Sequence, residues 1–430
     1  VKNANNGTTT DFDGNFLLSD VKSGETLVFS YVGFENQELI VGNEQNIDIS
    51  MEADYANLDE VVITGYGSTA KKDLVSSISQ IKGDALVNQP VARVDNMLQG
   101  RAAGVNVVST SGEPGAAATI RIRGMSSING NNQPLFVIDG FIVGTDFNLS
   151  NLNVNDIESI EVLKDASSLA IYGTRGAAGV ILINTKSGLS TQEGKVDVSI
   201  NHYTSMQQVY NYPEMASIGV WAEYWNEGVT YIDTNYGTND PSLAGNAIHA
   251  PNWESITPTD WRGLITRNGR IDNTDVNISG NTGNANYFIS YNRFVQEGII
   301  KASGLERNSL RANFDLKVND KIRTGIRMAV TDRKQENNKV NYQNVYYTLL
   351  PTMSVFKPDG SYNGENPVSG EITRNPVHDI NERIDHNFVT NVLANAFVEF
   401  DIASDFTLRS SVGTNLIFNK GNRYVGNLDP

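Results

Sequence analysis

The sequence predicts a mainly β chain in three parts: a small β-sandwich, a mixed α+β domain, and long antiparallel strands of a membrane β-barrel. Three observations predict this fold class. Short β-prone runs separated by turn signals occupy residues 1–52. Helical and strand patterns then mix up to about residue 190. From residue 195 onward, apolar and polar residues alternate over ten or more positions at a time, which is longer than an ordinary soluble strand.

Length and composition limit the class of protein. A chain of 430 residues suggests two to four domains. The sequence has no run of about 18 consecutive apolar residues, so no membrane helix is expected, whereas barrel strands leave only a weak hydropathy signal. The net charge of −16 argues against nucleic acid as a partner. The absence of cysteine excludes disulfides and thiolate metal sites.

The first domain is expected to be an antiparallel sandwich. Asp13-Gly14 and Ser23-Gly24 are turn signals between β-prone runs. Asp11 and Asp13 could be read as calcium ligands, but a calcium loop needs about 12 residues and a closing Glu, so a hairpin turn is the better interpretation. The expected strands are Thr8–Thr10, Asn15–Leu18, Thr26–Tyr31, Gln37–Val41 and Asn46–Met51.

A short apolar run, Val61-Val62-Ile63, follows this domain, with acidic residues before it and glycines after it. A hydrophobic segment between two domains can add its backbone to the sheet edge of another protein. An interdomain linker or edge strand is the alternative interpretation.

The second domain mixes a helix with several strands. Apolar residues at helical spacing predict a helix within residues 91–101. Asp139-Gly140, between two apolar runs, predicts a tight hairpin over residues 135–143. Asp156, Glu158 and Glu161 could suggest the paired carboxylates of glycoside hydrolysis, but a solvated helix start with an Asn cap is the simpler interpretation.

The third part alternates with a period of two. In one run, Leu310, Ala312, Phe314 and Leu316 alternate with polar residues. The links between such runs are either tight turns, as at Asn319-Asp320, or long excursions such as residues 207–271 and 334–385. Short turns at one end and long loops at the other are typical of outer-membrane barrels. The expected strands are 195–206, 272–282, 285–298, 306–318, 321–333, 386–402 and 405–419.

Signatures of catalysis and metal binding are weak. The sequence has no phosphate-binding loop and no nucleophile elbow. His378-Asp379 and Asp385-His386 could meet at a metal, but both lie in or beside an expected surface loop, and no metal site is predicted. Aromatic residues within 207–271 could stack on sugar rings or contact a lid protein. The favoured alternative is an amphipathic helix, Val220–Glu227, that packs its Trp residues inward.

Three sets of residues resemble one family. Residues 58–67 resemble the TonB box of the SusC/RagA-like outer-membrane transporters. Residues 7–16, with Ser30–Phe34, resemble the carboxypeptidase-regulatory-like domain at their front, without its usual first strand. The order of Leu98-Gln99-Gly100-Arg101, Ile122-Arg123-Gly124 and the run from 155 to 186 is similar to the TonB-dependent receptor plug.

The resemblance implies active import of a glycan oligosaccharide or peptide across the outer membrane of a Gram-negative bacterium of the Bacteroidota. A SusD/RagB-like lipoprotein would capture the substrate, and TonB, driven by ExbB/ExbD, would pull on the plug. The first domain and the box would lie in the periplasm, and outer-membrane lipid would surround the barrel. No catalytic residue, cofactor or metal is expected, so the chain is not expected to be an enzyme.

The resemblance also assigns site residues. By analogy, the TonB-binding residues are Asp59, Glu60, Val61, Val62 and Ile63. Plug loops 109–117 and 125–134 are candidates for the substrate-facing apex. Their candidate residues are Ser111, Glu113, Ser126, Asn129 and Asn131.

The expected domain boundaries are 1–52 for the sandwich, 53–70 for the box and linker, 71–190 for the plug and 191–430 for the partial barrel. Plugged outer-membrane transporters have about 22 strands, and far fewer are visible here, so the chain is expected to end inside the barrel. Because it begins with Val1, its start is also expected to be missing. Two alternatives remain: a siderophore- or cobalamin-type receptor without a lipoprotein lid, and a soluble structural or adhesion β-protein.

Overall fold

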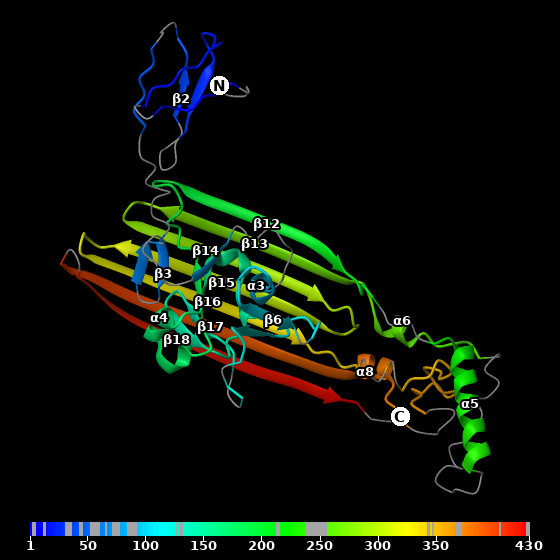
Figure 1. Ribbon diagram of the computed structural model, residues 1–430. Helices are drawn as coiled ribbons and strands as arrows, with labels where there is room; N and C mark the ends of the chain where they lie inside the picture. Colours follow the sequence, from blue (N-terminus) through cyan, green and yellow to red (C-terminus); the bar gives the residue numbers. More distant parts are fainter. Residues whose placement is uncertain are drawn as a thin grey trace. The chain divides into compact units, whose positions relative to one another are not determined.

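The structure of the chain is a computed structural model, in which two compact units, Val1–Ser77 and Ile78–Pro430, are described separately (Figure 1). The mainly β fold class is confirmed. The described residues are 1, 6–11, 14–30, 37–42, 46–51, 61–64, 67–70, 78–83, 93–109, 111–125, 127–128, 132–211, 216–236, 256–341, 345, 348–365, 372–403 and 406–426.

The first unit contains an antiparallel pair, β1 (Thr26–Phe29) and β2 (Gln37–Ile40). The Gly24 N–H donates to the Val41 carbonyl at 2.8 Å, which fixes the entry to β1. The rings of Phe16 and Phe29 meet edge to face with centroids 5.4 Å apart. These contacts confirm strands at two of the five expected positions.

The other three expected strands are not strands in the structure. Residues 8–10, 15–18 and 46–51 form no ladder within the described part of the unit. Individual side-chain contacts join two of them to the rest: Phe16 meets Phe29, and Gln37 Nε2 donates to the Ser50 carbonyl at 3.0 Å. Such short segments offer little apolar surface to bury, so single side-chain contacts replace a continuous ladder. At Asp11 the hairpin-turn interpretation fits, because its Oδ1 accepts from the Asn15 N–H at 2.8 Å; Asp13 lies outside the described residues.

The second unit contains a five-stranded sheet in the order β5-β10-β11-β8-β9 and a separate antiparallel pair, β6 with β7. We call this part, residues 78–190, the plug. β11 pairs parallel with β8, and the remaining ladders of the five-stranded sheet are antiparallel. The strands are β5 (Ile78–Lys82), β6 (Val105–Ser109), β7 (Ala118–Ile122), β8 (Leu135–Ile138), β9 (Phe141–Gly144), β10 (Ile157–Leu163) and β11 (Val180–Thr185).

Local sequence explains several of these elements. The expected helix is α3 (Val94–Leu98). The turn between β8 and β9 places Asp139 at φ 49° and Gly140 at φ 79°, as a two-residue hairpin turn requires. Short helical turns complete the plug, two of them begun by an Asn side chain that accepts from a backbone N–H. They are η2 (Leu149–Asn151), η3 (Val154–Asp156), α4 (Ala166–Leu169) and η4 (Ala170–Gly176).

The interpretation of the acidic cluster as a solvated helix start is wrong for Glu158 and Glu161, and Asp156 lies in an Asn-capped helical turn that is buried rather than solvated. Asp156 ends η3, and Glu158 and Glu161 lie on β10. β10 sits between β5 and β11, and most of its residues are buried. A central strand buries the apolar residues 157, 160, 162 and 163, whereas a solvated helix would expose some of them. Glu161 lies between these residues on the same strand and is therefore buried as well.

The plug is covered on both faces of its sheet. One face packs against α3, β6 and β7 in a core that includes Leu98, Ile120, Ile160 and Ile183. The other face packs Leu163, Val180 and Leu182 with Tyr172 of η4. Burial on both faces explains why β8 and β11 read as continuous apolar runs.

The long strands form a seven-stranded antiparallel sheet in which each strand pairs with the next one in sequence, from β12 to β18 (Figure 1). We call this sheet the wall. All seven expected strands are present, several of them longer than expected. They are β12 (Val196–Gln207), β13 (Gly269–Asn281), β14 (Ala285–Glu297), β15 (Gly304–Lys317), β16 (Ile322–Glu336), β17 (Arg383–Ala403) and β18 (Phe406–Val425).

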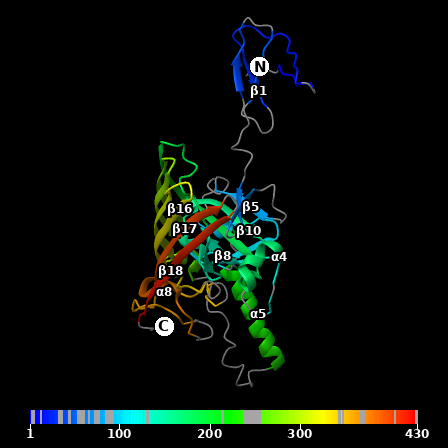
Figure 2. The ribbon, with the colours of Figure 1, turned by 90° about the vertical axis from the view of Figure 1, so that its left-hand side faces the viewer.

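The burial pattern of the wall is the reverse of that of a soluble sheet, with polar side chains buried and apolar side chains exposed. On β15, Ser309, Arg311 and Asn313 are at most 6% exposed, whereas Leu310 and Phe314 are 51% and 45% exposed. The plug lies on one face of the wall (Figure 2). The hydrogen bonds of Arg311 and Asn313 with Thr185 of the plug place the polar positions of β15 on that face. An exposed apolar face opposite a buried polar face is the pattern of a barrel strand in lipid.

The long links at one end of the wall carry the helices α5 (Ile218–Tyr236), α6 (Trp261–Ile265) and α8 (Pro376–Glu382). The expected helix is confirmed as part of α5. Its Trp221 and Trp225 are half-buried rather than packed into a core, and their rings stack on each other with centroids 5.9 Å apart. Trp261 is buried and its indole N–H donates to the Leu350 carbonyl at 3.0 Å. In the part of the chain that is described, no helix is both long and apolar enough to cross a membrane.

One glycine of β18 provides a test of how the plug seats on the wall. A Cβ at Gly413 would lie 2.5 Å from the ring of Phe141 at the tip of the β8–β9 hairpin. We expect Gly413→Val to lower the free energy of unfolding of the plug by about 1–3 kcal/mol, because the hairpin tip must move away. Thermal unfolding and limited proteolysis of the purified protein would measure this.

The matched control is Gly421→Val on the same strand, where nothing lies within 4 Å of a new Cβ. Equal behaviour of the two variants would contradict close packing of the hairpin tip on β18.

Candidate functional site

The first part of the candidate site is the strand that contains the apolar run after the first domain. Val61, Val62 and Ile63 lie in β3 (Val61–Thr64), which pairs antiparallel with β4 (Gly67–Ala70). Asp59 and Glu60 lie outside the described residues. A two-stranded hairpin is only marginally stable in water. The backbone of β3 is therefore weakly committed to its own chain.

The second part consists of the candidate plug loops. Ser111 is exposed, and its hydroxyl accepts from the Glu113 N–H at 3.1 Å. Glu113 Oε1 accepts in turn from the backbone N–H of Asn338, just beyond β16, at 2.5 Å. Ser126, Asn129 and Asn131 lie outside the described residues. The 109–117 loop thus reaches the end of the wall that carries the long links, which we call the loop end. There Gly115 also approaches Leu305 and Gln335.

The third part is the interface between the plug and the wall, which the sequence did not single out. Arg307 of β15 is 3% exposed, and its Nη1 donates to the carbonyls of Ser150 and Leu152 at 2.8 and 2.9 Å. Its Nη2 donates to Asn292 Oδ1 at 3.1 Å, and its guanidinium lies over the Phe294 ring. One wall arginine thus holds η2 through the plug backbone.

Arg311 lies four residues after Arg307 on the same face of β15, and it binds carboxylates of the plug. Its Nη1 lies 3.4 Å from Asp139 Oδ2 and its Nε lies 3.3 Å from Asp156 Oδ2. Asp139 also accepts from the N–H and hydroxyl of Thr185 at 2.8 and 3.0 Å. The hairpin turn, η3 and the end of β11 therefore converge on a single guanidinium.

Amide side chains complete the interface. Asn153 Nδ2 bridges Asp156 Oδ1 at 2.9 Å and the wall residue Asp275 Oδ2 at 2.6 Å. Asn313 Nδ2 donates to the Thr185 hydroxyl at 2.8 Å and to the Lys186 carbonyl at 2.7 Å. Two further contacts are Thr331 Oγ1 with the Asn151 carbonyl at 2.9 Å and Asn395 Nδ2 with the Asp139 carbonyl at 3.2 Å.

Burial and neighbouring charges have opposite effects on the ionisation of the carboxyl groups in this interface. Burial raises the pKa of the Asp156 carboxyl above its usual range, and the nearby Asp275 adds to the rise. The Arg311 guanidinium acts in the opposite direction and favours the ionised form. A buried charge without its partner costs several kcal/mol, so each charged side chain of the plug is stable in this interface only while its wall partner is present.

The signal that could have found this interface was present in the sequence. Arg307, Ser309, Arg311 and Asn313 are the polar positions of the β15 alternation, which faces the plug. Asp139 was interpreted only as a turn residue, yet its carboxylate is 9% exposed and faces Arg311. The alternation marks the face but does not indicate which plug residue each side chain meets.

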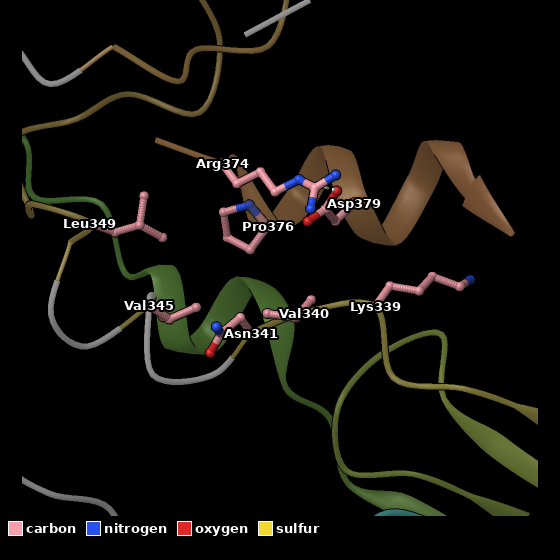
Figure 3. A pocket seen from close by; sticks show the side chains of 8 residues that line it. All are labelled: Lys339, Val340, Asn341, Val345, Leu349, Arg374, Pro376 and Asp379. Atoms are coloured by element: carbon pink, nitrogen blue, oxygen red, sulfur yellow. Dashed lines mark ion pairs between the residues drawn. The ribbon is translucent and has the colours of Figure 1, made fainter. Parts of the chain in front are cut away.

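A small hollow lies among the links at the loop end, with a cavity volume of about 120 Å³ (Figure 3). Val340, Val345, Leu349 and Pro376 line its apolar side, and the first three belong to the same buried cluster as Trp261. At its rim, Arg374 Nε lies 3.6 Å from Asp379 Oδ1. The hollow is therefore part of the core of the loop region, with a carboxylate–guanidinium pair at its edge.

The histidines considered for a metal site contact other groups. His378 Nδ1 lies 3.8 Å from Asp379 and His386 Nε2 lies 3.6 Å from Glu336. Among the described residues, no group of three or more His, Asp or Glu side chains could hold a metal ion.

Comparisons with known proteins place these features in a family. Residues 70–180 match the TonB-dependent Receptor Plug Domain, and residues 1–63 match the CarboxypepD_reg-like domain. The chain is 43% identical over 431 residues to TonB-dependent receptor P26 of Formosa agariphila, covering 100% of this chain and 42% of that protein. It is 37% identical over 319 residues to TonB-dependent receptor SusC of Bacteroides thetaiotaomicron, covering 73% of this chain and 30% of that protein.

A solved structure of the same kind of protein is also similar to this chain. The RagAB peptide importer in the "open-open" state superposes with a TM-score of 0.69 at 25% identity, covering 85% of this chain and 43% of that chain. The chain spans about two fifths of the length of the first of these relatives and of the RagAB chain.

Proposed function

Because the chain belongs to the SusC/RagA family of TonB-dependent receptors, we propose that it serves TonB-dependent import of a nutrient across the outer membrane. The nutrient is a glycan oligosaccharide or a peptide, and the partner on the cell surface is a SusD-like lipoprotein. The wall stands in the lipid of the outer membrane, and the first unit, with β3, lies in the periplasm.

The observation that supports this proposal best is the polar interface between plug and wall. A plug held by buried apolar contacts would resist displacement into water, because apolar surface would have to be exposed. Here, apolar contacts such as those of Leu393 are joined by many hydrogen bonds and ion pairs, and water can replace these polar contacts once the plug moves. This interface suits a plug that moves and returns.

The link to the energy source is proposed to be β3. TonB would add a strand to Val61, Val62 and Ile63, taking the place of the weak β4 or pairing with the other edge. Asp59 and Glu60 would extend this contact. Pulling on β3 reaches the plug through the sequence that leads to β5, the first plug strand.

The substrate side is proposed to be the plug loops at the loop end of the wall. Ser111 is available on the 109–117 loop, and Glu113 connects that loop to the end of β16. Ser126, Asn129 and Asn131 would line the same apex. Oxygen- and amide-bearing side chains of this kind can hydrogen-bond either sugar hydroxyls or peptide groups.

Gene deletion tests the proposal in the native bacterium. The deletion strain would be grown on a panel of single glycans and peptides, and we expect loss of growth on one nutrient class, with recovery when the gene is restored. Affinity purification of the tagged receptor is expected to bring down a lipoprotein. Unchanged growth on every nutrient, with impaired growth only under iron limitation, would contradict the proposal and favour a siderophore receptor.

A further inference from the structure

The inference concerns β5, the plug strand nearest in sequence to β3. β5 lies at the edge of the five-stranded sheet, and in the described part of the chain its ladder is with β10 alone. An edge strand held by one ladder can leave a sheet without breaking the rest of it. β5 is therefore the plug strand that a pull from the N-terminal side reaches first.

A carboxyl group is buried beside this strand, on the neighbouring strand β10. Glu161 of β10 is 1% exposed and stands directly opposite Gln80 of β5. Gln80 Nε2 and the Ser159 hydroxyl donate to Glu161 Oε1 at 3.3 and 3.2 Å. Glu161 Oε2 is buried and has no hydrogen-bond partner among the described residues. An ionised carboxylate with one bare oxygen is costly in such a place, whereas a neutral acid costs far less.

We propose that β5 is a proton-linked latch: it binds to β10 most tightly while Glu161 is protonated, and its release exposes Glu161, which then gives its proton to water. The structural basis is that β5 lies beside Glu161 in the sheet and supplies Gln80, one of its hydrogen-bond donors. The balance is simple, since one O–H bond of the carboxylic acid breaks and the proton passes to solvent. The use of this latch in transport rests on the proposed function, whereas the latch itself does not.

The surroundings of Glu161 support the direction of the linkage. Burial raises the pKa of Glu161 to about 7, the polar side chains of Ser159, Gln80 and Asn184 act against the rise, and the charge of Glu158 adds to it. Lys82 of β5, opposite Ser159, is exposed. From β11 the neighbour is the neutral Asn184, and from α4 and η4 Leu169 and Tyr172 join the apolar cluster on the sheet.

The sign follows from linkage. A carboxyl whose pKa is higher in the docked state stabilises docking at low pH and loses that contribution as the pH rises through about 7. With an ordinary pKa after release, the equilibrium constant for β5 opening rises roughly 70-fold between pH 5 and pH 8.

Amide hydrogen exchange of the purified full-length receptor tests the latch without TonB or substrate. The opening constant of β5 amides would be measured from pH 5 to 8 and corrected for intrinsic exchange rates. We expect the 70-fold rise in the natural protein and a flat profile in Glu161→Gln, which keeps the side-chain shape but cannot ionise. A flat natural profile, or a rise that persists in Glu161→Gln, would overturn the proposal.

Two controls separate the latch from general effects. Glu193→Gln removes an exposed carboxylate and is expected to leave the rise unchanged. Ser79→Ala removes the contact of Lys164 Nζ with Ser79 Oγ, 2.8 Å long, and is expected to raise the opening constant equally at every pH. A changed slope in either control would contradict the assignment to Glu161. These exchange measurements do not depend on transport, so the latch can fail or hold independently of the proposed function.

Discussion

We expect Val62→Pro to abolish nutrient uptake while the full-length receptor still inserts into the outer membrane. Val62 lies in the middle of β3, opposite Thr69. Proline removes the backbone N–H of that position and restricts the backbone before it, so a strand added by TonB loses a hydrogen bond at the centre of the contact. Uptake of the identified nutrient and the amount of receptor in the outer-membrane fraction would be measured together.

Two further variants make this test specific. Val62→Thr keeps the backbone donor and the β-branched shape, so uptake is expected to remain near normal. Thr69→Pro breaks the β3–β4 hairpin from the other side and leaves the sequence of β3 intact, so uptake is expected to persist. Normal uptake by Val62→Pro would defeat the assignment of β3, and loss of uptake in Thr69→Pro would show that the hairpin itself is required.

Arg311→Met is expected to loosen the plug. Removal of the guanidinium leaves Asp156 and Asp139 in a buried interface without their cationic partner, at a cost of about 3–5 kcal/mol. We expect the outer membrane to admit a large antibiotic that it normally excludes, and the plug of the purified receptor to be cut faster by protease.

A second substitution tests the cause. In Arg311→Met with Asp156→Asn, one unpaired carboxylate is removed, so part of the lost stability should return, whereas two independent defects would add. Arg293→Met is the matched control, because Arg293 is an exposed arginine on the adjacent strand β14 and lies on the opposite face of the wall. Equal leakage through the Arg293→Met receptor would contradict a specific role of Arg311.

The strands of the wall were predictable because their signal is local. Side chains of a strand alternate between two faces, so residues such as Leu310 and Arg311 reveal their separation without any knowledge of the partner strand. Turn chemistry is local too: Asp139-Gly140 predicted its hairpin because few residue pairs accept two positive φ angles in succession. Three of the five expected strands in residues 1–52 failed because such short segments carry too little alternation to distinguish a paired strand from an extended segment.

The family resemblance in the sequence was also sufficient to predict a plug and a partner-binding strand. The contacts of the candidate site were not predictable in the same way. Asp59, Glu60, Ser126, Asn129 and Asn131 lie outside the described residues, and their roles stay predictions, as does that of Val62. Ser111 and Glu113 lie where the loop reaches the end of the wall, and their role toward a substrate stays a prediction as well.

The sequence by itself determined which stretches become long strands, where the tight turns fall and which side of each strand is polar. Only the tertiary structure decided that Arg311 meets Asp139 and Asp156, and that Glu161 is buried on a central strand rather than exposed on a helix. The physical reason is that alternation and turn geometry depend on neighbouring residues. The partner of a buried charge depends on how segments more than 150 residues apart pack together, and no local pattern encodes that packing.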